Sequence, residues 1–220
     1  MLKILDLFDL NHSLAGEWLA QFTYPWEALS GIGEMILTLG AGLDPQLYSQ
    51  PQKDVWIAKD ASVAPSASIS GPCIIGPGTE VRHGAYIRGN ALVGANCVVG
   101  NATELKNTIL FDNVQVPHYN YVGDSILGYK AHMGAGAITS NVKSDKSLVV
   151  VKDREGDLYP TGRKKLGALL GDYVEIGCNA VLNPGTVVGR HSAVYPTTCA
   201  RGVIPPESIL KATGEIVPKR

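Results

Sequence analysis

The sequence predicts an all-β solenoid, a parallel β-helix made of hexapeptide repeats, with a short helical N-terminal segment and a protruding loop. A large apolar residue recurs at every sixth position, ten times in succession: Ile57, Val63, Ile69, Ile75, Val81, Ile87, Val93, Val99, Leu105 and Phe111. The position two residues earlier is mostly small: Ala61, Ala67, Cys73, Thr79, Ala85, Ala91, Cys97 and Thr103. This period fits one short strand plus one corner, and it fits neither an α-helix nor a continuous strand.

The same period returns twice after interruptions. One set follows a four-residue shift around residues 116–118 and comprises Tyr121, Leu127, Met133 and Thr139. A second set comprises Leu170, Ile176, Leu182, Val188 and Val194. Three inward positions per coil then give about six coils, whose parallel strands pair with those of the coils above and below.

Residues 1–50 do not share the repeat. Pro25 begins a helical pattern that ends at Gly40-Ala41-Gly42. Its apolar side comprises Trp26, Leu29, Ile36 and Leu39. The Gly-Ala-Gly run is a helix stop and not a dinucleotide loop, because no strand precedes it and no helix-opening pattern follows. We interpret residues 44–54 as the linker into the first coil.

The repeat also stops over residues 142–167, where two short apolar runs around Glu155-Gly156 predict a protruding hairpin. This segment holds seven basic residues: Lys143, Lys146, Lys152, Arg154, Arg163, Lys164 and Lys165. Charge alone leaves two interpretations open, a solvated loop or a basic arm over a site for phosphorylated ligands. The expected organisation is a helical segment and linker at 1–50, the β-helix at 51–204 and a C-terminal tail at 205–220.

Bulk properties limit the partners. The formal net charge of −1 gives no global electrostatic support to a nucleic-acid partner. No apolar run is long enough for a membrane span, and the first residues do not read as a signal peptide. Cys73 and Cys97 fall in register with the small positions, whereas Cys178 and Cys199 lack metal-like spacing. A reduced, cytoplasmic location is the simplest expectation.

The spacing of the histidines argues against one alternative function, a zinc carbonic anhydrase on the same fold. Such a site needs three converging histidines. The five histidines are His12, His83, His118, His132 and His191, and their spacings do not repeat near the eighteen-residue coil length. We therefore expect no metal.

Three stretches carry a more specific pattern: Asn101–Lys106, Val116–Asp124 and Gly134–Asn141. They resemble the acetyltransferase domain of bifunctional sugar-1-phosphate nucleotidylyltransferase/amino-sugar-1-phosphate N-acetyltransferases, the UDP-N-acetylglucosamine pyrophosphorylase family. Residues 163–171 are more similar to the archaeal-type members, and residues 24–29 resemble the linker that precedes the β-helix there. The resemblance implies a left-handed helix, against the usual right-handed crossover, and a cytoplasmic homotrimer with sites shared between subunits.

The resemblance also implies roles for residues. His118 matches the catalytic base that takes a proton from the amine, and Asn141 matches an asparagine near the amine and thioester. The backbone N–H of Ala135 matches an oxyanion donor. Arg88, Lys106 and Tyr121 match positions that hold the sugar and phosphate.

The co-substrate would be acetyl-CoA, lying near Cys178 and Tyr195, with Lys143 and Lys146 of the basic arm as further contacts. Two residues depart from the family pattern: His132 stands where bacterial members carry a sugar-contacting Asn, and Cys178 replaces a small hydroxyl residue.

The implied activity is N-acetylation of glucosamine-1-phosphate or galactosamine-1-phosphate in UDP-N-acetylhexosamine synthesis. No nucleotidyltransferase activity is expected, because the sequence shows no Gly-rich nucleotide loop. The alternative is a non-catalytic β-helix that serves as a scaffold or binds sugar phosphates.

Overall fold

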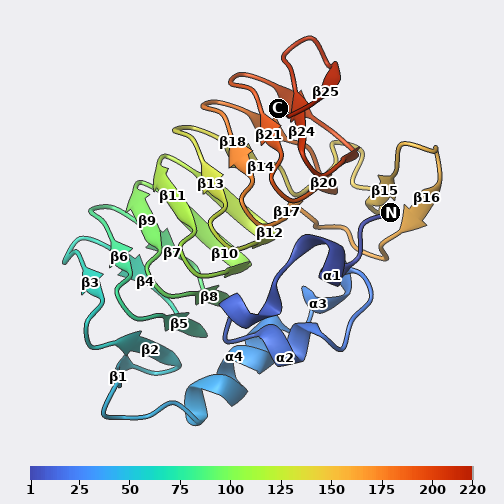
Figure 1. The fold of residues 1–220 in the computed structure, drawn as a ribbon. Coiled ribbons are helices and arrows are strands. Elements are labelled where there is room, and N and C mark those ends of the chain that lie inside the picture. The colour runs from blue at the N-terminus through green and yellow to red at the C-terminus, as the bar shows by residue number, and fades with distance from the viewer. Residues whose placement is uncertain (220) are drawn as a thin grey trace.

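A computed structural model, which describes residues 1–219, confirms the left-handed parallel β-helix with its helical N-terminal segment and protruding loop (Figure 1). The stacked strands form three faces, named here A, B and C. Face A contains β2 (Val55–Ala58), β5 (Cys73–Ile75), β8 (Ala91–Val93), the second half of β10 (Glu104–Leu110), the second half of β12 (Tyr121–Leu127), β17 (Ala168–Leu170), β20 (Thr186–Val188) and β23 (Val203–Ile204).

Faces B and C complete each coil. Face B contains β3 (Ser62–Val63), β6 (Glu80–Val81), β9 (Val98–Asn101), β11 (Gln115–His118), β13 (His132–Met133), β18 (Glu175–Ile176), β21 (Ala193–Val194) and β24 (Ser208–Leu210). Face C contains β4 (Ser68–Ile69), β7 (Tyr86–Ile87), the first halves of β10 and β12, β14 (Ile138–Thr139), β19 (Val181–Leu182) and β22 (Cys199–Ala200). The eight strands of face A exceed the six coils expected.

The strand register confirms most of the predicted inward column. Ile57 pairs with Ile75 and Ile75 with Val93, so coils of eighteen residues place one apolar side chain above the next. The later set is also in register, because Leu127 pairs with Leu170 and Leu170 with Val188. Their burial in a stacked core is the main stabilising contribution of the repeat.

Two predicted inward positions are wrong, Phe111 and Tyr121. Leu110, not Phe111, pairs with Val93, and Val122, not Tyr121, pairs with Leu105. The reason is that the coils around residues 107 and 124 are seventeen residues long, so each is one residue short at the corner between faces C and A. Phe111 instead packs on Phe8, with ring centroids 5.1 Å apart.

The same C–A corner carries the large insertion. Forty-three positions separate Met133 from Ile176, its partner in the ladder. The excess residues form the predicted hairpin, in which β15 (Val150–Lys152) pairs antiparallel with β16 (Leu158–Pro160). Val149 and Val151 are buried, which holds the arm on the stack.

The N-terminal segment covers face A (Figure 1). Its elements are α1 (Ile4–Leu7), the 3₁₀ turn η1 (Leu10–His12), α2 (Gly16–Leu19), α3 (Pro25–Ala28) and α4 (Ile32–Ala41). Helix α4 contacts β5, β8 and β10. The outward side chains of face A are also apolar and fully buried: Ile74, Leu92, Ile109, Ile126, Leu169 and Val187. The chain therefore buries both sides of one face.

The helix predicted from Pro25 is interrupted at residues 29–31 and ends at Ala41, with Gly42 as its C-cap. Gly40 allows close approach, because a Cβ there would lie 2.4 Å from the Trp56 ring. At the other end of the chain, β24 adds to face B and β25 (Ile216–Pro218) pairs antiparallel with it, so the stack extends past residue 204. β1 (Tyr48–Gln52) pairs antiparallel with β2 at the first coil.

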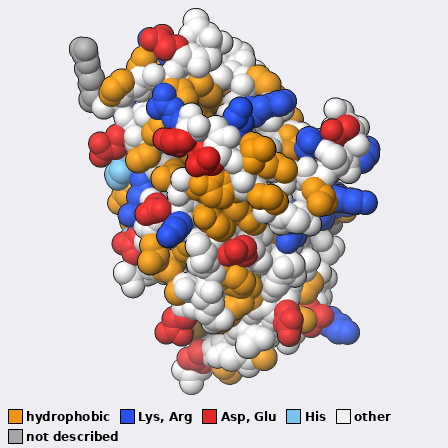
Figure 2. Space-filling view, turned by 90° about the vertical axis from the view of Figure 1, so that its right-hand side faces the viewer, with side chains coloured by type: hydrophobic (Ala, Val, Ile, Leu, Met, Phe, Trp, Pro, Cys, Tyr) orange, Lys and Arg blue, Asp and Glu red, His pale blue; other side chains and the backbone are white. Residues whose placement is uncertain are grey.

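Figure 2 shows the side of the molecule that carries the N-terminal segment and the arm. Apolar side chains gather in the centre of this side, and lysine, arginine, aspartate and glutamate side chains lie around them.

Candidate functional site

A polar network centred on Asp124 occupies the C–A corner. Its members, called here the Asp124 network, are Lys106, Asn107, Tyr121, Asp124 and Asn141. The Asn141 amide nitrogen donates to Asp124 Oδ2 at 2.6 Å and to the Tyr121 hydroxyl oxygen at 3.1 Å. Lys106 Nζ lies 3.4 Å from both Asp124 oxygens. The structure thus brings together three of the residues that the resemblance singled out.

Coil stacking explains this convergence. Residues 107, 124 and 141 follow one another at the seventeen-residue coil length, so they occupy the same corner on three successive coils. Asn107 and Asp124 both have positive φ, at 52° and 49°, in the left-handed conformation that Asn and Asp tolerate. The Asp124 side chain is 4% exposed, and a buried carboxylate needs such donors to offset its desolvation.

The network connects the coils to the rest of the chain. The Asn107 amide nitrogen donates to Asp124 Oδ1 at 3.0 Å and to the carbonyl of Leu29 at 3.1 Å, in the N-terminal segment. The Gly167 N–H, at the end of the arm, donates to the carbonyl of Asp124 at 2.8 Å. Burial, followed by the charge of Asp124, raises the pKa of Tyr121 above its usual value.

Arg88 lies at the same corner one coil before Lys106. Its Nη1 donates to Glu104 Oε1 at 2.7 Å, and this hydrogen bond raises the pKa of the Arg88 guanidinium. The guanidinium carbon also lies 5.8 Å from the Tyr86 ring centre. Because the pair is exposed, water screens it and leaves the guanidinium accessible.

His118 lies at the opposite edge of face C, on an exposed corner. Asn120 holds this turn: its Oδ1 accepts from the His118 N–H at 3.2 Å, and its Nδ2 donates to the carbonyls of Gly134 and Ala137. Tyr119 has a φ of 51°. Across residues 1–219, the His118 ring has no hydrogen-bond partner, so its nitrogens face solvent.

Ala135 lies on the coil next to His118, because the Gly136 N–H donates to the His118 carbonyl at 3.0 Å. Within the part of the chain that the structure describes, the Ala135 N–H makes no hydrogen bond, as an oxyanion donor requires. Cys178 occupies the equivalent corner position on the following coil, where its thiol is exposed, and its N–H is also free. The free N–H is shared by Ala135 and Cys178, whereas the His118 N–H at the equivalent position of the preceding coil is bonded to Asn120.

The two edges of face C do not meet within one chain. The turn at Tyr119 and Asn120 and the β12 residues Tyr121–Gly123 lie between His118 and Asp124, and in residues 1–219 no hydrogen bond or ion pair joins His118 to the Asp124 network. Tyr195 is exposed on a later coil, next to face B. His132 lies on face B, where its Nδ1 is 2.8 Å from Glu175 Oε2, and among residues 1–219 it forms no hydrogen bond with Arg88, Lys106 or Tyr121.

The arm and the last coils enclose a groove of about 690 Å³. Lys143, Lys152 and Arg201 line it, against one acidic residue, Asp145. Lys143 Nζ lies 3.5 Å from Asp145, so one of the three cations is paired. Lys146 is exposed on the adjoining turn and does not line the groove.

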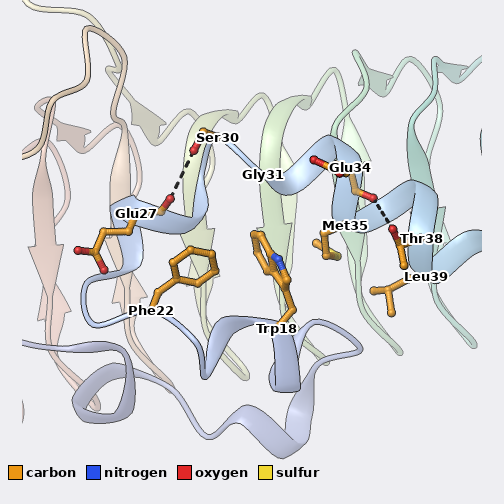
Figure 3. Close-up of a pocket in the computed structure, with 9 residues that line it drawn as sticks. All are labelled: Trp18, Phe22, Glu27, Ser30, Gly31, Glu34, Met35, Thr38 and Leu39. Atoms are coloured by element: carbon orange, nitrogen blue, oxygen red, sulfur yellow. Dashed lines mark hydrogen bonds between the residues drawn. The ribbon is translucent and has the colours of Figure 1, made fainter.

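A separate apolar pocket of about 340 Å³ lies within the N-terminal segment (Figure 3). Trp18 and Phe22 project into it from the α2 side, and Met35 and Leu39 line it from α4. None of the predicted site residues contributes to it.

Sequence reasoning missed Asp124, Glu104 and Asn107 as members of the site. The spacing of 107, 124 and 141 at one coil length could have found Asn107 and Asp124, had the short coils been recognised, whereas it gives no signal for Glu104. Over residues 1–219, no group of three or more metal-ligating side chains converges, and no helix is long and apolar enough to cross a membrane.

Comparison with known proteins finds a likeness over the stack that carries these residues. The family model of the GMPPB C-terminal domain matches residues 69–204. A bifunctional sugar-1-phosphate nucleotidylyltransferase/acetyltransferase of Sulfurisphaera tokodaii is 34% identical over 95 residues, which are 43% of this chain and 23% of the relative. The bifunctional protein GlmU of Methanocaldococcus jannaschii is 37% identical over 91 residues, 41% of this chain and 22% of the relative.

The chain therefore spans less than a quarter of either relative, and the resemblance to their acetyltransferase region is confirmed. Among solved structures, a putative acetyltransferase from Desulfovibrio desulfuricans is 17% identical with a TM-score of 0.42, covering 83% of this chain and 30% of that one. The acetyltransferase domain of PglB from Neisseria gonorrhoeae in complex with acetyl coenzyme A is 18% identical with a TM-score of 0.35, covering 86% and 67%.

Proposed function

This chain belongs to the family of the GMPPB C-terminal domain, and we propose that it is an acetyl-CoA-dependent N-acetyltransferase acting on an amino-sugar 1-phosphate. The acceptor would be glucosamine-1-phosphate or galactosamine-1-phosphate. The Asp124 network carries the proposal, because Lys106, Tyr121 and Asn141, three residues that the family resemblance assigns to the acceptor, converge there. The names of the archaeal relatives support the reaction class.

In the proposed acetyl transfer, His118 and Ala135 act at one edge of face C. The acceptor amine attacks the thioester carbonyl carbon and loses a proton to the His118 ring. The carbonyl oxygen becomes an oxyanion, to which the free N–H of Ala135 donates. When the intermediate collapses, the carbon–sulfur bond breaks, and His118 returns the proton to the thiolate of CoA. The products are the acetamido sugar phosphate and free CoA.

The basic groove beside the arm supports binding of a phosphorylated ligand. Lys152 and Arg201 lack carboxylate partners in the described chain, and Lys143 has one. Such a groove attracts the phosphates of acetyl-CoA, which carry several negative charges. Lys146 would contribute to the field from the rim.

The separation of the two edges supports a homotrimer with shared sites. His118 of one copy and the Asp124 network of a neighbour could then face each other, which closed symmetry repeats three times. His132 and Tyr195, which lie apart from the network in one chain, would enter the site only from a neighbouring copy. A monomer in light scattering at micromolar concentration would refute this arrangement.

A second candidate is a non-catalytic β-helix that binds sugar phosphates or serves as a scaffold. The observation that favours it is the pairing of both predicted phosphate-binding cations, Arg88 with Glu104 and Lys106 with Asp124. These carboxylates offset the positive charge that a phosphate would meet.

The deciding experiment is release of thiol from acetyl-CoA, screened against glucosamine-1-phosphate, galactosamine-1-phosphate and nucleotide-linked amino sugars. Release that depends on one of the two sugar 1-phosphates supports the enzyme. Acetyl-CoA binding in calorimetry without thiol release, or no binding at all, supports the second candidate.

A further inference from the structure

Asp124 itself has no assigned role, although three side chains of the C–A corner donate to its carboxylate. Its two oxygens accept from Asn141 at 2.6 Å and from Asn107 at 3.0 Å, and both lie 3.4 Å from Lys106 Nζ. An ionised carboxylate can only accept hydrogen bonds. The groups around it must therefore all present donors.

This requirement determines the orientation of the Asn141 amide. A side-chain amide has a donating and an accepting end. Because the Asp124 carboxylate accepts, the amide nitrogen faces it and the carbonyl oxygen Oδ1 points the other way. In the hydrogen bonds of residues 1–219, Asn141 Oδ1 has no partner, so it is free to accept.

The orientation extends to Tyr121. Its hydroxyl oxygen accepts from the same Asn141 nitrogen at 3.1 Å, so the Tyr121 O–H proton points elsewhere and can donate. The corner then offers one acceptor, Asn141 Oδ1, beside one donor, the Tyr121 hydroxyl. A ligand that fits presents an N–H donor next to an oxygen acceptor, as an amino sugar does with its amine and a neighbouring hydroxyl or phosphate oxygen.

We propose that Asp124 is a positioning residue that sets the donor and acceptor polarity of the site and so selects acceptors that carry an amine. This inference rests on the proposed function for its substrate. Its structural part, the orientation of Asn141, stands on the contacts alone. The surroundings hold Asp124 in place, because Asn107 ties it to the N-terminal segment and Gly167 ties it to the arm.

The test is Asp124→Asn, which keeps the shape but can itself donate a hydrogen bond. Asn141 is then free to turn its carbonyl towards residue 124, which reverses the polarity of the corner. We expect kcat/KM for the amine acceptor to fall about 100-fold, the scale of a misplaced reacting group. The loss should lie mainly in kcat, and the KM for acetyl-CoA should stay unchanged.

Asp112→Asn is the matched control. Asp112 is a half-buried acid on another corner, and it accepts from the Ala95 N–H at 2.7 Å, which an asparagine oxygen can also do. Its kinetics should equal those of the wild type. Melting temperatures of both variants separate a loss of fold from a loss of orientation.

A second measurement does not depend on activity. The side-chain NH₂ resonances of Asn141, identified by their absence in Asn141→Ala, should exchange slowly with solvent in the wild type and rapidly in Asp124→Asn. If the wild type acetylates none of the acceptors, the proposed function fails, and these resonances still decide the orientation. Resonances that are identical in the wild type and Asp124→Asn would overturn the inference, as would an unchanged kcat in an active enzyme.

Discussion

Faces A and C share one backbone repeat but differ in the side chains that point outward. On face A these are Ile74, Leu92, Ile109, Ile126, Leu169 and Val187, all buried. On face C they are Tyr86, Glu104, Tyr121, Ile138, Val181 and Cys199, of which none is fully buried. The first set packs against the chain's own N-terminal segment, and the second remains on the surface, where we propose that ligands bind. The inward column therefore determines the fold, and the outward columns determine what each face contacts.

The largest expected effect comes from breaking the column that both faces share. Val93→Asp would place an unpaired charge between Ile75 and Leu110, two neighbours in the ladder. We expect a loss of about 4 kcal/mol or more in the free energy of unfolding, since nothing nearby can pair with the carboxylate. Urea denaturation measures this loss. An unchanged midpoint would show that the register described for the core is wrong.

The next effect separates the two faces directly. Leu92→Ala removes an outward side chain that is 1% exposed under the N-terminal segment, and Tyr86→Ala removes one that is 45% exposed on face C. We expect Leu92→Ala to cost about 2–5 kcal/mol of unfolding free energy and Tyr86→Ala about 0.5 kcal/mol or less. Equal costs in urea denaturation would mean that the faces do not differ as described.

The sequence predicts the inward apolar column well, but it predicts the short corners and the outward side chains of face A poorly. The inward positions were predictable because burial at every sixth residue leaves a regular apolar signal. Phe111 and Tyr121 were misplaced because a corner that loses one residue shifts every later position. The outward stripe of face A was missed, although the pairs Ile74-Ile75 and Leu92-Val93 carry two consecutive apolar residues, which indicates burial on both sides.

The site shows the same limit. Lys106, Tyr121 and Asn141 were predicted through the family resemblance, and the structure brings them together. Asp124 was not predicted, because its importance comes from contacts between coils that a motif read along the chain does not reveal. That His118 lies apart from this network could likewise be recognised only from the three-dimensional positions of the two edges of face C.

A smaller effect tests the arm beside face C. Replacing Lys143 and Lys146 with Ala should raise the apparent KM for acetyl-CoA roughly 3- to 10-fold at low salt, and added salt should weaken the effect. Lys53→Ala with Lys59→Ala, two exposed lysines at the first coil, is the control that removes the same charge elsewhere. Identical kinetics for both pairs would leave the arm as a solvated loop.

The four cysteines allow the accessibility of the interior and of the surface to be compared in the unmodified sequence. Burial raises the pKa of Cys73 and of Cys97 to about 12, whereas the Cys178 and Cys199 thiols are exposed. Because the thiolate is the reactive form, a disulfide reagent at pH 8 should label Cys178 and Cys199 in the folded protein. Cys73 and Cys97 should react only after unfolding. Rapid labelling of Cys73 in the native state would contradict the buried register of its strand.

Acetyl transfer at face C is the central claim, and His118→Ala tests it most directly. The acetylated sugar phosphate is measured by mass spectrometry alongside thiol release, for the wild type and the variant. We expect the variant to keep its fold and its affinity for acetyl-CoA, because the His118 ring makes no hydrogen bond within residues 1–219. Its turnover should fall by about 10²–10⁴-fold, the scale of a lost general base. Turnover within a few-fold of the wild type would contradict the catalytic assignment.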